Sequence, residues 1–408
     1  MKIIFKLSVA IRLISFLGLT ACSVEISQTQ SVQGISTHPP TTPTEAFTPT
    51  LPSIDLPQKM TPTDTKPGDP ILSPALSLTP DPAFPFPAVK TPSLNLQVIP
   101  GYPEALEGRM LFLSTLEDGL QTLIAFDLNT GEASPLFVTP PKAWILSQSV
   151  YASASEILIA YAPPPPEGKP SYGYTDLYIL KPDGSLEPIL QRTEDLEAFF
   201  GAIFSPAGGY IYYSHFFADS TAYSGFRYYI NRVGYPTGTP EVVVEDAFWQ
   251  RLSEDGSKLA YVTFDDRDYS ELFVANADGT NPVRVLDPDQ HPIIDAPFFS
   301  PDNQYLYFSA IVDVTTPTPL AWWEKLLGVH IALAHTVPSD FFRVSLTDGS
   351  VIRVTNLQGL GMYGTFSPDG QHIAFLNGAG LYVMRPDGAG LFQVLSGYGL
   401  YGSVEWIP

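Results

Sequence analysis

The amino-acid sequence predicts an all-β fold, a six-bladed β-propeller with a short helical insertion, over residues 101–408. Three observations predict it: a repeated motif of strands and turns, a regular spacing of glycine turns, and a match between the two ends of the domain. A signal peptide and a linker rich in proline and threonine are predicted to precede the propeller.

The clearest copy of the repeat lies near the C-terminus. Phe366–Leu376 predicts a strand, a Ser-Pro-Asp-Gly turn and a second strand, and Gly380–Gly388 adds a third strand and an Asp-Gly turn. Leu252–Val262 and Glu271–Gly279 form another copy. Alternating apolar residues are typical of half-buried strands, and glycine supplies the positive φ that such turns require.

The second turn of the repeat gives the length of the unit. It ends at glycines that follow one another at intervals of 53, 54, 41, 70 and 39 residues, namely Gly131, Gly184, Gly238, Gly279, Gly349 and Gly388. The basic unit is therefore near 40 residues, with the excess in loops. Four-stranded units of ~40–45 residues, arranged radially, build a β-propeller.

The two ends of the domain predict how the ring closes. Ser403–Pro408 aligns with Tyr363–Pro368, and Arg109–Ser114 aligns with the strand His372–Asn377. We therefore expect the C-terminal segment to supply the first strand of the blade whose other strands come from about 109–138. This closure gives six blades and leaves no open edge between the termini, and seven blades are the alternative.

These motifs, Ser-Pro-Asp-Gly before an apolar strand and then Leu381–Gly388, resemble the TolB-like (WD-type) propeller repeat over essentially all of 101–408. The resemblance implies the fold but little about activity. Such repeats occur in the periplasmic protein of the Tol-Pal system and in propellers attached to prolyl oligopeptidase-type hydrolases. This chain lacks the small α/β domain of the former and has no room for a hydrolase domain of ~250 residues. A Tol-Pal partnership is therefore not carried over.

The first 22 residues are predicted to be a bacterial lipoprotein signal peptide. A basic start precedes an apolar run at 13–19, which is shorter than the ~20 residues that span a bilayer. Leu19-Thr20-Ala21-Cys22 resembles a lipobox, which implies lipidation of Cys22 and cleavage before it. Cys22 is the only cysteine of the chain. We expect an exported protein anchored through Cys22 to the extracytoplasmic face of a bacterial membrane, either the cell membrane or an outer membrane.

Residues 23–100 are predicted to be a disordered linker, because 16 of the 41 prolines fall there and aromatic residues are few. The chain has a formal net charge of −21, and removal of the signal peptide with its three basic residues makes it −24. Such an acidic protein repels the phosphates of nucleic acids, so we exclude nucleic acid as a partner.

Few motifs in the sequence indicate chemistry. The chain has no Gly-x-Ser-x-Gly, no His-Glu-x-x-His and no phosphate-binding glycine loop, so we expect neither a catalytic site nor a cofactor. Asp265, Asp266 and Asp268 form a weak calcium candidate, although this loop is also the ordinary polar loop of the repeat. His291, beside two aspartates, needs a further ligand to hold a metal ion.

The fifth repeat carries the largest insertion, which the sequence predicts to be helical. Adjacent tryptophans are typical of contact sites with proteins or lipid. We therefore hypothesise that a partner binds Trp322, Trp323, Leu326 and Leu327 within residues 318–338. The alternative is a lid that packs over the propeller and buries both tryptophans.

The sequence leaves two functions open. The first is a monomeric binding or scaffold protein that uses a face of the propeller to contact an unknown protein partner. The alternative is a carbohydrate-binding protein or hydrolase with its site in the central depression. Two or three carboxylates or histidines that converge on the central channel would distinguish the alternative from the first.

Overall fold

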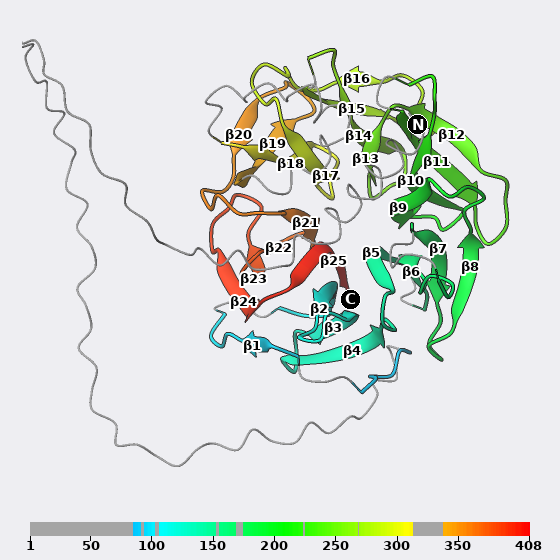
Figure 1. The fold of residues 1–408 in the computed structure, drawn as a ribbon. Coiled ribbons are helices and arrows are strands. Elements are labelled where there is room, and N and C mark those ends of the chain that lie inside the picture. The colour runs from blue at the N-terminus through cyan, green and yellow to red at the C-terminus, as the bar shows by residue number, and fades with distance from the viewer. Residues whose placement is uncertain are drawn as a thin grey trace, which may run out of the picture. The chain divides into compact units, whose positions relative to one another are not determined.

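The computed structural model describes residues 85–90, 94–102, 106–151, 155–168, 174–222, 225–267, 269–312 and 338–408. These residues form six antiparallel sheets placed radially around one axis (Figure 1). The described part contains no helix that is both long and apolar enough to cross a bilayer.

The first three blades have four strands each and are given from the innermost strand outwards. Blade 1 consists of β25 (Leu400–Ile407), β2 (Arg109–Thr115), β3 (Gln121–Asp127) and β4 (Glu132–Val138). Blade 2 consists of β5 (Trp144–Val150), β6 (Ile157–Ala162), β7 (Asp176–Leu180) and β8 (Leu186–Leu190). Blade 3 consists of β9 (Glu197–Phe204), β10 (Tyr210–Ala218), β11 (Phe226–Gly234) and β12 (Glu241–Glu245).

The other three blades follow the same order, and the last one has a fifth strand. Blade 4 consists of β13 (Phe248–Leu252), β14 (Lys258–Phe264), β15 (Ser270–Asn276) and β16 (Val283–Arg284). Blade 5 consists of β17 (Ile294–Phe299), β18 (Tyr305–Ile311), β19 (Ser339–Ser345) and β20 (Val351–Arg353). Blade 6 consists of β21 (Tyr363–Phe366), β22 (Ile373–Asn377), β23 (Gly380–Met384), β24 (Phe392–Gly397) and β1 (Leu96–Val98).

The chain closes the ring as the sequence predicted. The C-terminal strand β25 pairs antiparallel with β2, with Arg109 opposite Ile407 and Leu111 opposite Glu405. The indole Nε1 of Trp406 donates a hydrogen bond of 3.0 Å to the carbonyl of Glu107. The six predicted blades and the predicted β-propeller fold are both confirmed.

The propeller unit begins earlier than the predicted boundary at residue 101. Strand β1 pairs with the outer edge of β24, with Leu96 opposite Gly397. Upstream of β1, Phe86 is only 6% exposed and joins an apolar cluster of blades 1 and 2. The assignment of all of 23–100 to the linker is thus wrong at its end. Phe86 and Leu96 at the end of this segment pack against the blades.

The connections between strands divide the propeller into two faces. The turns from the first to the second strand and from the third to the fourth lie on one face, which we call the turn face. The connections that leave β2, β6, β10, β14 and β18 lie on the other, the loop face. Antiparallel pairing within every blade requires this separation.

Candidate functional site

A cavity of about 340 Å³ lies on the axis of the ring. The inner strands of all six blades contribute residues to its lining. Pro206, Glu254, Pro301 and Pro368, which belong to turns that directly follow inner strands, line it as well. The cavity therefore opens on the turn face.

One equivalent position on each inner strand forms the middle of this cavity. It is the next-to-last strand residue in five blades and lies one residue earlier in the longer β25. These six positions, which we call the waist ring, are Ser149, Ile203, Arg251, Phe298, Thr365 and Glu405. The waist ring thus contains one cation and one anion among neutral side chains.

A second set of equivalent positions lies two residues earlier on each inner strand. It consists of Ser147, Gly201, Trp249, Ala296, Tyr363 and Ser403. Four of its members are small. The other two, Trp249 and Tyr363, contact each other with ring centroids 5.4 Å apart.

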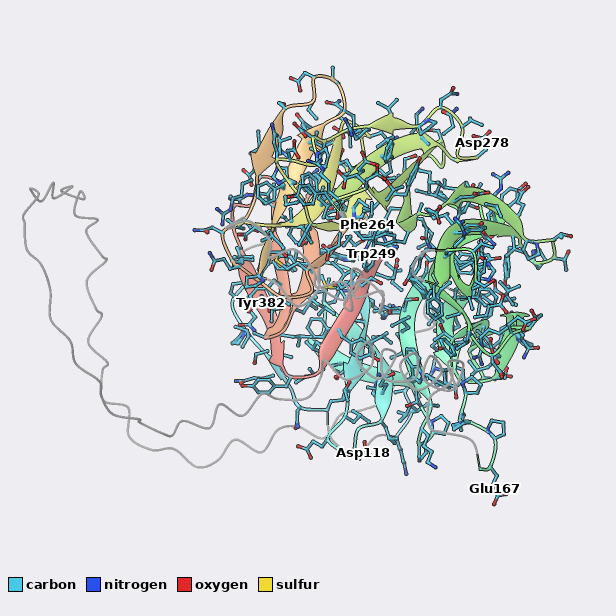
Figure 2. All side chains as sticks on the ribbon, turned by 45° about the horizontal axis from the view of Figure 1, so that its top comes forward. Asp118, Glu167, Trp249, Phe264, Asp278 and Tyr382 are labelled. Atoms are coloured by element: carbon cyan, nitrogen blue, oxygen red, sulfur yellow. The ribbon has the colours of Figure 1, made fainter. Side chains whose placement is uncertain are left out.

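Trp249 and Tyr363 come from blades 4 and 6, and the equivalent residue of the blade between them is the small Ala296. Figure 2 shows Trp249 near the middle of the ring. Trp249 has a φ of 60°, and the register of β13 shifts between Phe248 and Arg251. Such a bulge redirects a side chain. It places the indole of Trp249 against the aromatic ring of Tyr363.

Hydrogen bonds between neighbouring inner strands fix the walls. The amide Nε2 of Gln148 donates to the carbonyl of Ser403 at 2.6 Å, and that of Gln250 donates to the carbonyl of Gly201 at 2.7 Å. The N–H of Gly201 donates in turn to Oγ of Ser147 at 3.0 Å. These contacts join blades that share no ladder, so the side chains of the cavity are held on a rigid frame.

Arg251 and Glu405 face each other in this frame. They come from blades 4 and 1, which lie opposite one another in a ring of six. Among the residues that the structure describes, neither the guanidinium nor the carboxylate has a hydrogen bond or ion pair with a protein group. Both side chains remain partly exposed to the cavity.

Burial changes the titration of the groups around the axis. It raises the pKa of Glu405 to about 7, although the charge of Arg251 opposes the shift. Burial also lowers the pKa of Arg251. Asp295, which is 3% exposed, has a pKa well above its usual value because it is buried. Near neutral pH the cavity therefore carries the positive charge of Arg251 and a half-ionised Glu405.

The turns of the turn face carry many exposed carboxylates. Those in turns of the turn face are Asp183, Glu254, Asp255, Asp278, Asp302, Asp348, Asp369 and Asp387. Hydrogen bonds from Ser253 and Ser257 lower the pKa of Asp255 to about 2, and those from Ser350 and Ser345 lower that of Asp348 to about 2. The turns therefore keep their negative charge at any pH near neutral.

Most sites predicted from the sequence lie outside the described residues: Cys22, Trp322, Trp323, Leu326, Leu327 and Asp268. Asp265 is ion-paired with Arg267 at 2.7 Å, and Asp266 is exposed. The imidazole of His291 packs against Phe342 with centroids 4.8 Å apart. Within the described part of the chain, no three His, Cys, Asp or Glu side chains cluster as a metal site.

Sequence reasoning missed Arg251, Glu405, Trp249 and Tyr363. A signal was present, because aligning the inner strands places Arg251 and Glu405 where other blades have serine, isoleucine, phenylalanine or threonine. A charge at a position that faces the axis of a propeller marks the channel. The alignment of Ser403–Pro408 with the sixth repeat already paired Glu405 with a threonine.

No protein-family model and no curated protein matches this sequence. Among solved structures, the fold is similar to a protein assigned as TolB from Agrobacterium tumefaciens, with a TM-score of 0.51 and 17% identity over 74% of this chain and 99% of that one. It is also similar to TolB from Acinetobacter baumannii, with a TM-score of 0.53 and 16% identity over 75% of this chain and 68% of that one.

A hydrazine synthase from Kuenenia stuttgartiensis has a comparable TM-score of 0.51 at 13% identity, over 72% of this chain and 46% of that one. At these identities the likeness shows the fold alone, and proteins of different function share it. The chain is a six-bladed β-propeller with the fold of the TolB proteins.

Proposed function

We propose that this protein is a membrane-anchored, extracytoplasmic binding protein that holds a protein partner on the turn face of its propeller. One observation carries the proposal: the axial cavity opens in the middle of that face, so the turns form a rim around a recess. Concave sites with a few well-placed polar groups are where partners usually bind. The lipid on Cys22 and the linker would hold this face near other proteins of the cell envelope.

The negative charge of the rim indicates which kind of partner binds there. Eight exposed carboxylates lie in turns of the turn face, and the pKa values of Asp255 and Asp348 are lowered to about 2, so these two remain ionised. Complementary charge speeds association and selects among partners. We therefore propose a partner that presents a basic surface or segment to the rim.

The alternative of a carbohydrate-binding protein or hydrolase is supported by one observation. A carboxyl with a pKa of about 7, as for Glu405, suits general acid–base catalysis. Among the lining residues, however, Glu254 in the rim is the only other carboxylate, and no histidine is present. The convergent carboxylates that such a hydrolase needs are therefore not assembled around Glu405.

A pulldown from detergent-solubilised native membranes tests the proposed function. The intact lipoprotein is compared with Asp302→Asn/Asp369→Asn in the rim and with the matched control Asp118→Asn/Glu167→Gln on the loop face (Figure 2). We expect the rim variant to capture at least threefold less partner than the intact protein and the control. Capture should also weaken as salt rises from about 0.05 to about 0.5 M, since salt screens exposed charges.

Deletion of residues 318–338 distinguishes binding on the turn face from binding on the loop face. The chain leaves β18 and enters β19 on the loop face, opposite the mouth of the cavity. If the partner binds the turn face as proposed, the deletion variant should still capture it. A partner that is lost with the deletion and kept by the rim variant would contradict the assignment to the turn face and support the insertion as the contact.

A further inference from the structure

The axial cavity presents two opposite charges that no group among the described residues satisfies. The guanidinium of Arg251 and the carboxylate of Glu405 stand on opposite walls and have no hydrogen bond or ion pair among the described residues. Removing charges from bulk water without pairing them costs several kcal/mol each. An arrangement of this kind is characteristic of groups that are paired by something bound between them.

The rest of the waist ring describes the body of that ligand. At the level of the two charges lie the hydroxyls of Ser149 and Thr365, whereas the side chains of Phe298 and Ile203 are packed in apolar clusters. The walls therefore add two small hydrogen-bonding groups to the two charges. A ligand that fits has one anionic end, one cationic end and a small body between them.

The size of the cavity limits the ligand. A cavity of about 340 Å³ lies at the lower end of the ~300–1,000 Å³ of small-molecule sites. It corresponds to roughly ten water molecules at ~30 Å³ each. The lining includes Pro206, Pro301 and Pro368 from turns of the turn face. The occupant must therefore be small and enters from that face.

We propose that the axial cavity binds a small zwitterion of the size of an amino acid or dipeptide, with its carboxylate on Arg251 and its ammonium group on Glu405. This site goes beyond the proposed function, since it needs no protein partner. A guanidinium binds a carboxylate through two parallel hydrogen bonds, and a partly desolvated carboxylate attracts an ammonium group. The acidic turns around the mouth concentrate the cationic end of the ligand at the entrance.

Isothermal titration calorimetry of the detergent-purified full chain tests this site with glycyl-phenylalanine and free phenylalanine as probes. N-acetylglycyl-phenylalanine lacks the ammonium group, and glycyl-phenylalaninamide lacks the carboxylate. We expect at least one zwitterion to bind and each blocked form of the dipeptide to bind tenfold more weakly or worse, since hydrogen bonds to charged groups are worth this much.

The variants assign each end of the ligand. Glu405→Gln should weaken the dipeptide tenfold or more and leave the acetylated form unchanged, whereas Arg251→Met should weaken the dipeptide and leave the amide form unchanged. Asp118→Asn on the loop face is the matched control and should bind like the wild type. If neither zwitterion binds, or if the blocked forms bind as tightly as the dipeptide, the proposal is wrong. The comparison of the dipeptide with its blocked forms uses only the wild-type protein, so it tests the proposal even if a variant fails to fold.

A second readout follows from the titration of Glu405, whose pKa is about 7. An ammonium group beside this carboxyl favours its ionised form, so binding at pH 7 releases protons. The measured heat should then change with the ionisation enthalpy of the buffer, and this dependence should vanish in Glu405→Gln. A buffer-independent heat in the wild type would place the ligand away from Glu405.

Discussion

Replacing Trp406 by alanine is expected to lower the free energy of unfolding by about 4 kcal/mol, within the range of buried tryptophan truncations. The side chain of Trp406 is 8% exposed and belongs to the apolar cluster between blades 1 and 6, with Met110 and Leu381. Its indole also donates to the carbonyl of Glu107 at 3.0 Å. The variant therefore weakens the strand that closes the ring, and urea unfolding followed by fluorescence or circular dichroism measures the loss.

Tyr398→Ala is the matched control for Trp406→Ala. Tyr398 lies in the turn before β25 and is 85% exposed, so its removal should change stability by less than about 0.5 kcal/mol. If the two variants lose similar amounts of unfolding free energy, the packing of Trp406 in β25 does not stabilise the propeller.

Replacing Glu405 by glutamine is expected to stabilise the protein at alkaline pH and to have little effect in acid. The pKa of Glu405 is raised from 4.5 to about 7 in the folded protein, so the carboxyl is held in its protonated form. A raised pKa contributes stability that is complete below pH 4.5 and is lost as the pH rises to about 7. Glutamine resembles the protonated form at every pH.

The shift corresponds to an upper limit of about 3 kcal/mol, which solvent in the cavity reduces to about 2 kcal/mol. Glu405→Gln should therefore unfold at a higher urea concentration than the wild type at pH 8 and at the same concentration near pH 4.5. Glu254→Gln in the exposed rim is the control and should show no such pH-dependent difference. Destabilisation by Glu405→Gln at pH 8 would mean that the ionised pair with Arg251 stabilises the fold.

The propeller itself was readable from the sequence because its signals are local. The Asp-Gly and Ser-Pro turns lie within a few residues of the strands they join, and Trp406 occupies the position of Phe366 in the repeat. The start of the propeller unit was not predicted, because its signals are not local. Phe86 and Leu96 sit in a segment whose average composition is that of a linker, and only the finished blades show where they pack.

The alignment of the inner strands marks Arg251 and Glu405, but the geometry of the cavity could not be predicted because it depends on closure of the whole ring. Arg251 and Glu405 are far apart in the sequence, and only a ring of six blades places them on opposite walls. The contact between Trp249 and Tyr363 likewise joins residues that are distant in the sequence. Even the number of blades, which determines the distances across the ring, was predicted from the alignment of the two ends of the domain.

Photo-crosslinking in native membranes tests the central claim most directly. A photoreactive amino acid replaces Glu254 at the rim of the cavity in one variant and Asp118 on the loop face in another. The proposed function predicts a discrete crosslinked partner from position 254 that disappears at high salt, and none from position 118. A partner crosslinked from position 118 and not from position 254 would contradict it and place the contact on the loop face.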